Sequence, residues 1–326
     1  TFVKEGRSGM QAQKKGSAIK MRSSNKQGYF KRFSIYFVKN WQLYIIFLFP
    51  ALLLTIVFKY LPMLGIIIAF EEYSPIRGYL GSEWIGLYNF RRLFSSTEFG
   101  RLLLNTLKLS GYNLVWGFFP PIILALLLYR VQSNKLRKKA QLVVYLPYFI
   151  STIVLAGMVR LFFSPVGPIN GLFGSKVDFM AEAGWFRTLY IGSGIWQCAG
   201  WSSIIYSATL AGVSQELIDA ARIDGATILQ QIRNVELPAL KPVIVIQFIL
   251  SAGNIMSIGF EKVYAMQTDL NKITSDIIPT YVYRMGLEMG DYGYSTAVGL
   301  FNSVVNLILL VAVNYVVTKL NDGEGL

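Results

Sequence analysis

Long apolar segments alternate with shorter polar segments along most of the chain. Six of the apolar segments exceed the roughly 20 residues with which an α-helix crosses about 30 Å of hydrocarbon. Runs of this length with few charges predict membrane-spanning helices. The predicted spans are residues 44–70, 103–129, 140–163, 188–213, 243–264 and 295–318. We therefore expect an all-α protein that crosses a membrane six times.

Proline residues interrupt the first three predicted spans: Pro50 and Pro62, then Pro120 and Pro121, then Pro147. Each proline removes one backbone donor, so the carbonyl that it frees needs another partner. Ordinary helix kinks would explain these positions. Broken helices that line a transport path would explain them as well, and the prolines alone do not decide between the two.

The composition supports a membrane protein and limits its chemistry. Of the 326 residues, 53% are hydrophobic and 15% are charged, whereas soluble domains carry about 25% charged residues. The chain has one cysteine, Cys198, and no histidine. An internal disulfide is therefore excluded, and the absence of imidazole disfavours zinc chemistry and general-base hydrolysis. We expect no metal site and no catalytic residue, and we interpret Cys198 as a packing residue.

The basic residues predict the orientation of the chain. Residues 1–40 hold ten of the 31 basic residues and one acid, so this tail contributes 10 − 1 = +9 to the net charge of +13. Such a tail before an apolar run is more typical of the cytoplasmic face of a membrane than of nucleic-acid binding. Residues 130–139 hold five basic residues and no acid, which predicts a cytoplasmic loop. Six spans within a transmembrane domain of residues 41–320 then place both termini, with the short end 321–326, and the loop 213–242 in the cytoplasm.

The segments that connect the predicted spans on the outer side of the membrane are longer than tight turns. In residues 71–101, apolar side chains recur at roughly helical spacing with charges between them, which predicts an amphipathic helix on the outer membrane surface. These side chains are Trp84, Ile85, Leu87, Phe90 and Leu93. Residues 164–185 are rich in Gly and Pro and predict an irregular outer loop.

One polar stretch, ELIDAARIDGATILQQIRNVELPALKP at residues 216–242, stands between two apolar runs. Ser214 is a helix-capping residue type, and Asp224-Gly225 is a typical helix stop. Thr227 with Gln230 matches a capping box at the start of a second helix. Because proline disfavours the helical region for the residue before it, we expect that helix to end near Leu237, before Pro238. The stretch therefore predicts a rigid pair of short helices that could fit a groove on a partner.

The same stretch carries a family resemblance. Asp219-Ala220-Ala221, then Gly225, then Leu237-Pro238 resemble the cytoplasmic loop of permease subunits in binding-protein-dependent ABC importers of the type I fold. The family usually has Glu where this chain has Asp219. The segment Ala-Arg-Ile-Asp-Gly-Ala at 221–226 is typical of the sugar-importing branch, and WIGLYNFRRLF and LLNTLKLS resemble carbohydrate permeases further upstream. The resemblance covers residues 43–320.

The resemblance implies a mechanism and a set of partners. Such permeases form one half of a membrane path, pair with a second and usually different permease chain, and dock on two cytoplasmic ATPase subunits that bind ATP and Mg. An extracellular sugar-binding protein delivers the substrate, and the assembly lies in the bacterial cytoplasmic membrane. This chain has no phosphate-binding loop of the G-x-x-x-x-G-K-[ST] type, so we expect the ATPase to be a separate subunit. The residues expected to couple to that ATPase are Glu216, Asp219, Ala220, Ala221, Asp224, Gly225, Leu237 and Pro238.

Polar and aromatic side chains inside the predicted spans are candidates for the substrate path, because such groups are costly in hydrocarbon. Sugars present apolar ring faces edged by hydroxyls, which suits aromatic rings beside amides. Helix–helix hydrogen bonds and interfacial aromatics explain the same residues, and for Arg160 we favour a side chain that reaches the membrane surface over one that binds a uronic-acid carboxylate. The candidates are Arg160, Trp196, Gln197, Trp201, Ser203, Tyr206, Asn254, Ser257, Glu261 and Asn302.

Within the sugar branch, the region around the first span resembles permeases for pectin-derived or alginate oligosaccharides. Two other functions stay open. An ion-coupled secondary carrier should show charged groups deep in its spans, and an embedded glycosyl-transfer enzyme should show clustered carboxylates at one face. A requirement for internal ATP rather than an ion gradient separates the importer from the carrier.

Overall fold

The computed structural model describes residues 41–253, 255 and 259–320. The predicted tail 1–40, the end 321–326 and the candidates Asn254 and Ser257 lie outside these described residues. The chain divides into two compact units, Thr1–Gly65 and Ile66–Leu326.

The first predicted span is helical over its whole length. A helix runs from Trp41 to Phe70. It consists of five successive helical segments: α2 (Trp41–Leu43), η1 (Tyr44–Leu48), α3 (Phe49–Thr55), η2 (Ile56–Tyr60) and η3 (Leu61–Phe70). The segments η1 and η2 are π-helical turns, and each ends just before the residue that precedes a proline. Phe49 N–H donates to Tyr44 O, and Leu61 N–H donates to Ile56 O. A wider turn at these points lets the helix pass Pro50 and Pro62, whose rings would otherwise press on the carbonyl four residues back.

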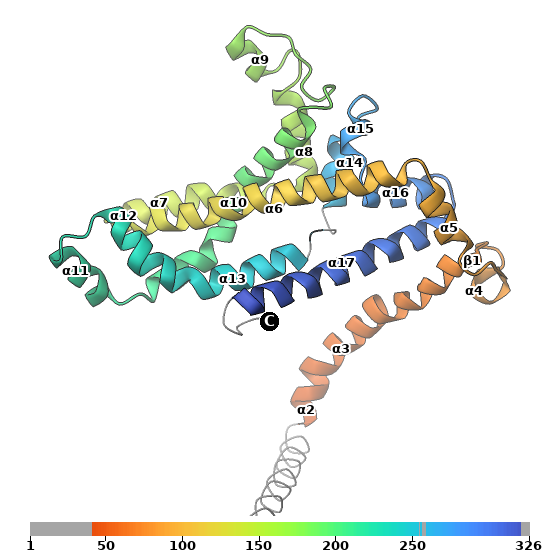
Figure 1. The fold of residues 1–326 in the computed structure, drawn as a ribbon, viewed down its shortest axis with the longest axis horizontal. Coiled ribbons are helices and arrows are strands. Elements are labelled where there is room, and N and C mark those ends of the chain that lie inside the picture. Colours follow the sequence, from red (N-terminus) through yellow and green to blue (C-terminus); the bar gives the residue numbers. More distant parts are fainter. Residues whose placement is uncertain (1–40, 254, 256–258, 321–326) are drawn as a thin grey trace, which may run out of the picture. The chain divides into compact units, whose positions relative to one another are not determined.

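Four long helices lie side by side in the second unit (Figure 1). They are α6 (Phe99–Tyr129), α10 (Phe186–Ala211), α13 (Leu237–Gly253) and α17 (Tyr292–Leu320). α6 packs along α10, α13 packs along α17, and α10 also contacts α13. One buried apolar cluster joins three of these helices through Ile122 and Ala125 of α6, Tyr206 and Leu210 of α10, and Leu240 of α13.

The predicted third span, 140–163, is interrupted at Pro147 as predicted, and of the two interpretations left open the structure shows a broken helix. α7 (Asn134–Tyr145) and the short η4 (Leu146–Phe149) are followed by α8 (Thr152–Phe162), which turns away by 95°. Pro147 is the second residue of η4, and Ser151 is extended and caps α8 by accepting from Val154 N–H. A proline and a new N-cap within five residues stop one helix and start another.

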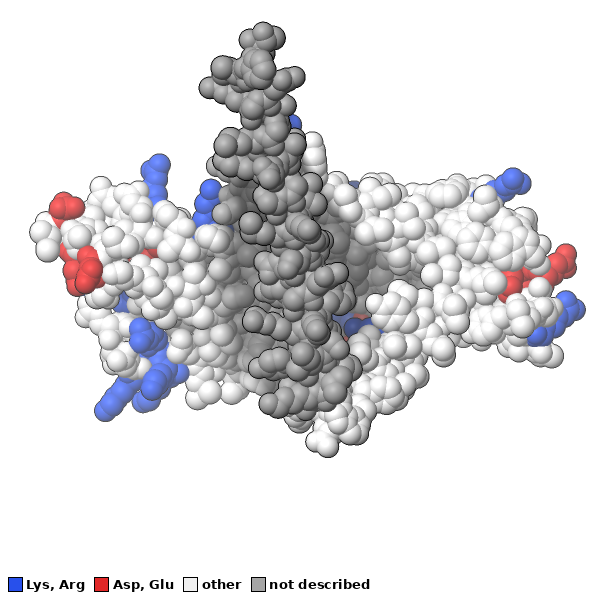
Figure 2. All heavy atoms as spheres, turned by 90° about the horizontal axis from the view of Figure 1, so that it is seen from below, with Lys and Arg blue, Asp and Glu red and all other residues white. Residues whose placement is uncertain are grey.

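The structure supports fewer spans than the six predicted. Among the described residues, four helices are long and apolar enough to cross a membrane, and the bent pair around Pro147 is a fifth candidate. α10 has 26 residues, about 39 Å of helix, but Ser, Gly and Gln residues interrupt its apolar sequence. α10 is therefore not among the four helices that are long and apolar enough to cross a membrane. In Figure 2, both basic and acidic side chains are visible at the left and right ends of the view, where no grey atoms cover the surface.

The fifth predicted span is displaced, and the predicted helix end near Leu237 is wrong. A continuous helix runs from Ile228 to Gly253, through α12 (Ile228–Gln231), the π-helical turn η5 (Ile232–Glu236) and α13. Leu237 N–H donates to Ile232 O, so a π turn again precedes the proline and the helix continues through Pro238. Residues 260–264, predicted to end this span, belong to the separate helix α14 (Phe260–Met266).

The segment after the first span is a small hairpin and a short amphipathic helix, so the predicted amphipathic helix is much shorter than residues 71–101, and the fold is not purely helical. β1 (Glu71–Glu72) pairs antiparallel with β2 (Glu83–Trp84) around α4 (Gly78–Gly81), and only α5 (Tyr88–Ser95) is helical before α6. Gly78 and Gly86 have φ of 65° and 61°, the left-handed region that interrupts a helix. Trp84 stacks on Phe70 with ring centroids 5.5 Å apart.

The remaining elements are short helices that lie between the long helices in the sequence. The predicted irregular segment 164–185 contains one short helix, α9 (Pro168–Phe173), and the chain before α17 forms α15 (Lys272–Ser275), α16 (Ile278–Tyr283) and η6 (Arg284–Glu288). Asp276 is fully buried, and its carboxylate accepts from Arg284 at 2.8 and 3.2 Å. Burial alone would lower the pKa of Arg284, but the hydrogen bonds and charge of Asp276 raise it above its ordinary value.

Candidate functional site

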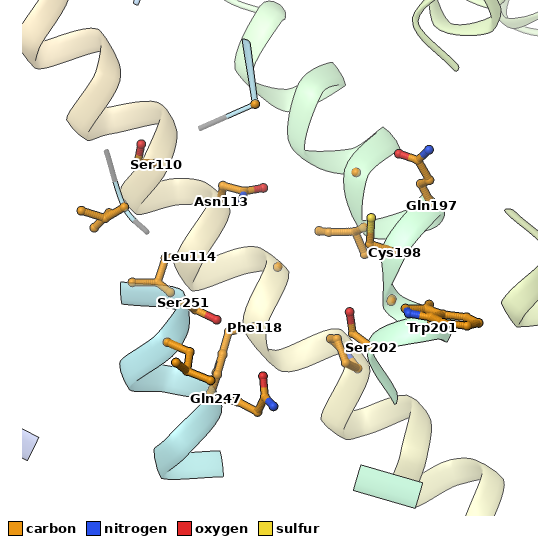
Figure 3. A pocket seen from close by; sticks show the side chains of 18 of the residues that line it. Ser110, Asn113, Leu114, Phe118, Gln197, Cys198, Trp201, Ser202, Gln247 and Ser251 are labelled. Atoms are coloured by element: carbon orange, nitrogen blue, oxygen red, sulfur yellow. The ribbon is translucent and has the colours of Figure 1, made fainter. Parts of the chain in front are cut away.

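A cavity of about 720 Å³ lies between α6, α10, α13 and α14. This volume falls within the range of about 300–1,000 Å³ that small-ligand sites occupy. Amide and hydroxyl side chains from three helices line it, as Figure 3 shows for Asn113 of α6, Ser202 of α10 and Gln247 of α13. The wall therefore offers hydrogen-bond donors and acceptors inside an otherwise apolar helix layer.

Three of the predicted path residues line this cavity: Gln197, Trp201 and Tyr206. Gln197 Nε2 donates to Ile150 O at 2.7 Å, at the break between η4 and α8. Trp201 stacks on Tyr148 of η4, with centroids 4.6 Å apart and the ring planes 6° from parallel. The cavity wall on α10 is thus held directly against the broken span.

The other described path candidates lie outside the cavity wall. Ser203 is fully buried and donates to Gly200 O at 2.6 Å, within its own helix. Trp196 is half-exposed, Arg160 and Glu261 are exposed on α8 and α14, and Asn302 is half-buried on α17.

Several polar residues of the wall are not among the residues predicted from the sequence. Ser110 and Asn113 lie three residues apart on α6, and Gln247 and Ser251 lie four apart on α13. Residues at these spacings share one helix face, so a search for polar periodicity inside the spans would have found both pairs. Lys262 of α14 also lines the cavity.

A second candidate site is the polar stretch between α10 and α13. α11 (Gln215–Ile223) begins at Ser214, whose side chain accepts from Glu216 N–H at 3.2 Å. Gly225 ends the turn after it with φ of 73°. Thr227 and Gln230 form the predicted capping box at the start of α12. The predicted caps and the glycine turn are confirmed, whereas the second helix is the beginning of the long helix Ile228–Gly253.

The stretch presents an exposed, partly apolar surface. Ile218 is the buried anchor of α11, whereas Leu217, Ile223, Ile228 and Leu229 are 58%, 86%, 63% and 74% exposed. Ala220 is exposed and Ala221 half-buried, and Asp219 pairs within the helix with Arg222 at 3.2 Å. The other members of the predicted coupling set, Glu216, Asp224, Leu237 and Pro238, are also exposed. Large exposed apolar side chains therefore lie beside small ones on this surface.

A buried ion pair joins this stretch to α6. Arg130, at the C-terminal end of α6, pairs with the fully buried Glu236 and donates to Gln231 Oε1 at 2.8 Å. Gln231 Nε2 in turn donates to Ala226 O at 2.8 Å, directly after Gly225. The turn, the start of the long helix and the end of α6 are therefore tied by charged and amide hydrogen bonds. From the sequence, Arg130 was identified only as one of the five basic residues of the predicted cytoplasmic loop 130–139.

A profile of the family described as "Binding-protein-dependent transport system inner membrane component" matches residues 117–322. The chain belongs to this family. The matched range contains most of the wall of α10 and α13, the stretch around α11, and Arg130 with both of its partners. The predicted family membership is confirmed, and the chain is a membrane permease component.

Known relatives match this permease over most of its length. The polygalacturonan/rhamnogalacturonan transport system permease protein YteP of Bacillus subtilis (strain 168) is 42% identical over 301 residues, which are 91% of this chain and 93% of the relative. A solved bacterial ABC transporter involved in the import of the acidic polysaccharide alginate has a similar chain, with a TM-score of 0.81 and 37% identity over 89% of this chain and 99% of that one. The bacterial alginate ABC transporter in complex with an alginate pentasaccharide-bound periplasmic protein gives a TM-score of 0.80 and 36% identity, over 89% and 98%.

Proposed function

We propose that this permease forms one half of the membrane path of an ATP-driven importer for oligosaccharides. Family membership supports transport that depends on a binding protein. The observation that carries the proposal is the physical link between the two sites. The exposed surface around α11 is tied through Gln231 and Glu236 to Arg130 of α6, and α6 supplies Ser110 and Asn113 to the cavity wall.

The exposed surface is the contact for a separate ATPase in this proposal. ATP binding closes a pair of ATPase subunits, and the surface from Glu216 to Pro238 converts that closure into movement of the helices. Ala220 and Ala221 permit close approach, and Leu217 and Ile223 supply apolar contact area. ATP and Mg bind to the ATPase subunits, so this chain has no catalytic role.

An acidic saccharide is the proposed cargo. The relatives named above transport polygalacturonan, rhamnogalacturonan or alginate. The amides and hydroxyls of the cavity suit sugar hydroxyls, and the rings of Trp201 and Tyr206 suit sugar ring faces. An external binding protein delivers the sugar, and a second, homologous permease chain completes the path.

The proposed location is the bacterial cytoplasmic membrane, with both termini and the α11 surface facing the cytoplasm. The five basic residues of 130–139 support this orientation. α7, which carries four of them, packs against the same helices, α6 and α10, that lead to the α11 surface.

Transport by the reconstituted complete importer tests the function. We expect vesicles to take up a labelled oligogalacturonate only when binding protein lies outside and hydrolysable ATP lies inside. A non-hydrolysable ATP analogue is the control. Uptake driven by a proton or sodium gradient without ATP would identify a secondary carrier instead, and a new glycosidic product without uptake would identify a glycosyl-transfer enzyme.

A further inference from the structure

The cavity wall contains one buried cation. Lys262 lies in α14 and is only 7% exposed, yet it lines the cavity. Its Nζ donates to Tyr190 O at 2.8 Å and lies 4.7 Å from the centroid of the Tyr190 ring. An ammonium group has three N–H donors, and the carbonyl takes one of them.

No carboxylate neutralises this charge in the described part of the chain. None of the ion pairs there includes Lys262, and the residues that line the cavity include no Asp or Glu. Buried charges are normally paired, because removing an ion from water is costly. A buried ammonium held by one carbonyl and one ring face therefore retains capacity for an anion.

The backbone beside Lys262 keeps its ammonium open to the cavity. Gly194 also lines the cavity, one turn after Tyr190 on α10. A Cβ at position 194 would lie 3.1 Å from Lys262 Nζ, tighter than an ordinary contact. The absence of a side chain there leaves space beside the ammonium for a ligand atom.

We propose that Lys262 binds a carboxylate of the transported saccharide and thereby selects acidic over neutral sugars. This inference rests on the proposed function and deepens it by naming the residue that reads the charge of the cargo. Asn113 and Gln247 then bind hydroxyls, and Trp201 packs on a ring face. Among the basic candidates, Lys262 suits this role better than Arg160, which is exposed on α8.

Matched substrates test the proposal in the complete importer. Oligogalacturonate and its full methyl ester share a backbone and differ in carboxylate charge. We expect Lys262→Met to lower uptake of the acidic form, at a concentration well below its KM, by about tenfold or more, the effect of losing one hydrogen bond between charged groups. Uptake of the ester should fall much less than uptake of the acid, and Lys262→Arg should retain most uptake of the acid.

An equal loss for acid and ester would overturn the proposal, because it would show that Lys262 only holds α14 against α10. Unchanged uptake of the acid by Lys262→Met would overturn it as well.

A second measurement does not depend on transport. Cys198 lines the same cavity and is exposed, so its thiol reports the local potential. The purified importer, with other accessible cysteines replaced, is labelled with an anionic and a cationic methanethiosulfonate of similar size. The ratio of the two rates cancels the thiolate fraction. We expect Lys262→Met to lower the anionic-to-cationic ratio by about fivefold, as loss of a nearby charge in a confined site implies.

An unchanged ratio would show that the ammonium does not act on the cavity and would overturn the proposal. If the wild-type importer took up neither saccharide with ATP, the proposed function would fail. The labelling ratio would still decide whether the cavity attracts anions through Lys262.

Discussion

At the residue scale, one backbone angle fixes the turn between α11 and α12. Gly225 has φ of 73°, and a Cβ built there would meet no atom within 4 Å. Space is therefore available, and only the left-handed backbone disfavours other residues. Asparagine tolerates this region better than most residues, whereas a β-branched side chain does not.

We expect Gly225→Val to reduce uptake per ATP hydrolysed, with Gly225→Asn as the matched variant that stays near wild type. A strain of about 1–2 kcal/mol corresponds to about a 5–30-fold lower population of the native turn. Coupled uptake and ATPase activity are measured in the same vesicles. Equal coupling in both variants would show that this angle has no part in the link between ATPase and path.

Other single residues show why the cavity could be predicted only in part. Gln197, Trp201 and Tyr206 stand out because amides and aromatics interrupt an apolar span. Ser203 stands in the same stretch, but its hydroxyl bonds within its own helix, and sequence does not reveal which face of a buried helix meets the cavity. Lys262 was missed because its burial depends on contact with Tyr190, 72 positions away in the chain.

At the scale of elements, α10 and α7 approach each other closely. A Cβ at Gly200 would lie 1.8 Å from Val144 O, so the two backbones meet where a side chain cannot fit. This contact lies one turn from Gln197 and directly before Trp201, both of which contact the broken span. Gly200 thus permits α10 to pack closely against α7 next to the break.

Gly200→Ala should therefore destabilise the permease by about 1–3 kcal/mol, the usual effect of overpacking. Gly192 lies in the same helix with no atom within 4 Å of a built Cβ, so Gly192→Ala should be neutral or stabilising by up to about 1 kcal/mol. Thermal unfolding of the purified complex compares the two. A loss of stability that is no greater for Gly200→Ala than for Gly192→Ala would contradict the close approach.

The elements themselves were partly predictable. Hydropathy predicted the helices around spans one, two, four and six, and capping residues predicted the start of α11 and of α12. The rule that proline ends a helix failed at Pro238, because a π turn of five residues precedes it. Such a turn has no sequence signal of its own, since it arises from the balance between the proline ring and the packing of the rest of the helix.

At the scale of the whole molecule, the proposed orientation can be measured directly. In a Cys198→Ser background, Leu172→Cys on α9 and Lys138→Cys on α7 place exposed thiols on the predicted outer and inner sides. We expect a membrane-impermeant maleimide to label Leu172→Cys in intact cells and Lys138→Cys only after permeabilisation. The opposite pattern would reverse the orientation and place the α11 surface outside, which would remove the ATPase contact from the proposed function.

The anchoring of α6 at Arg130 has a mechanical consequence. α6 is one helix of 31 residues that continues through Pro120 and Pro121, so it is about 46 Å long. Its C-terminal end is held by the ion pair between Arg130 and Glu236. If α6 tilted as a rigid body by about 10° about this end, Asn113 would move by about 4 Å and Phe99 by about 8 Å. The displacement therefore grows with distance from the proposed ATPase contact, and the N-terminal end of α6, beyond the cavity, would move furthest.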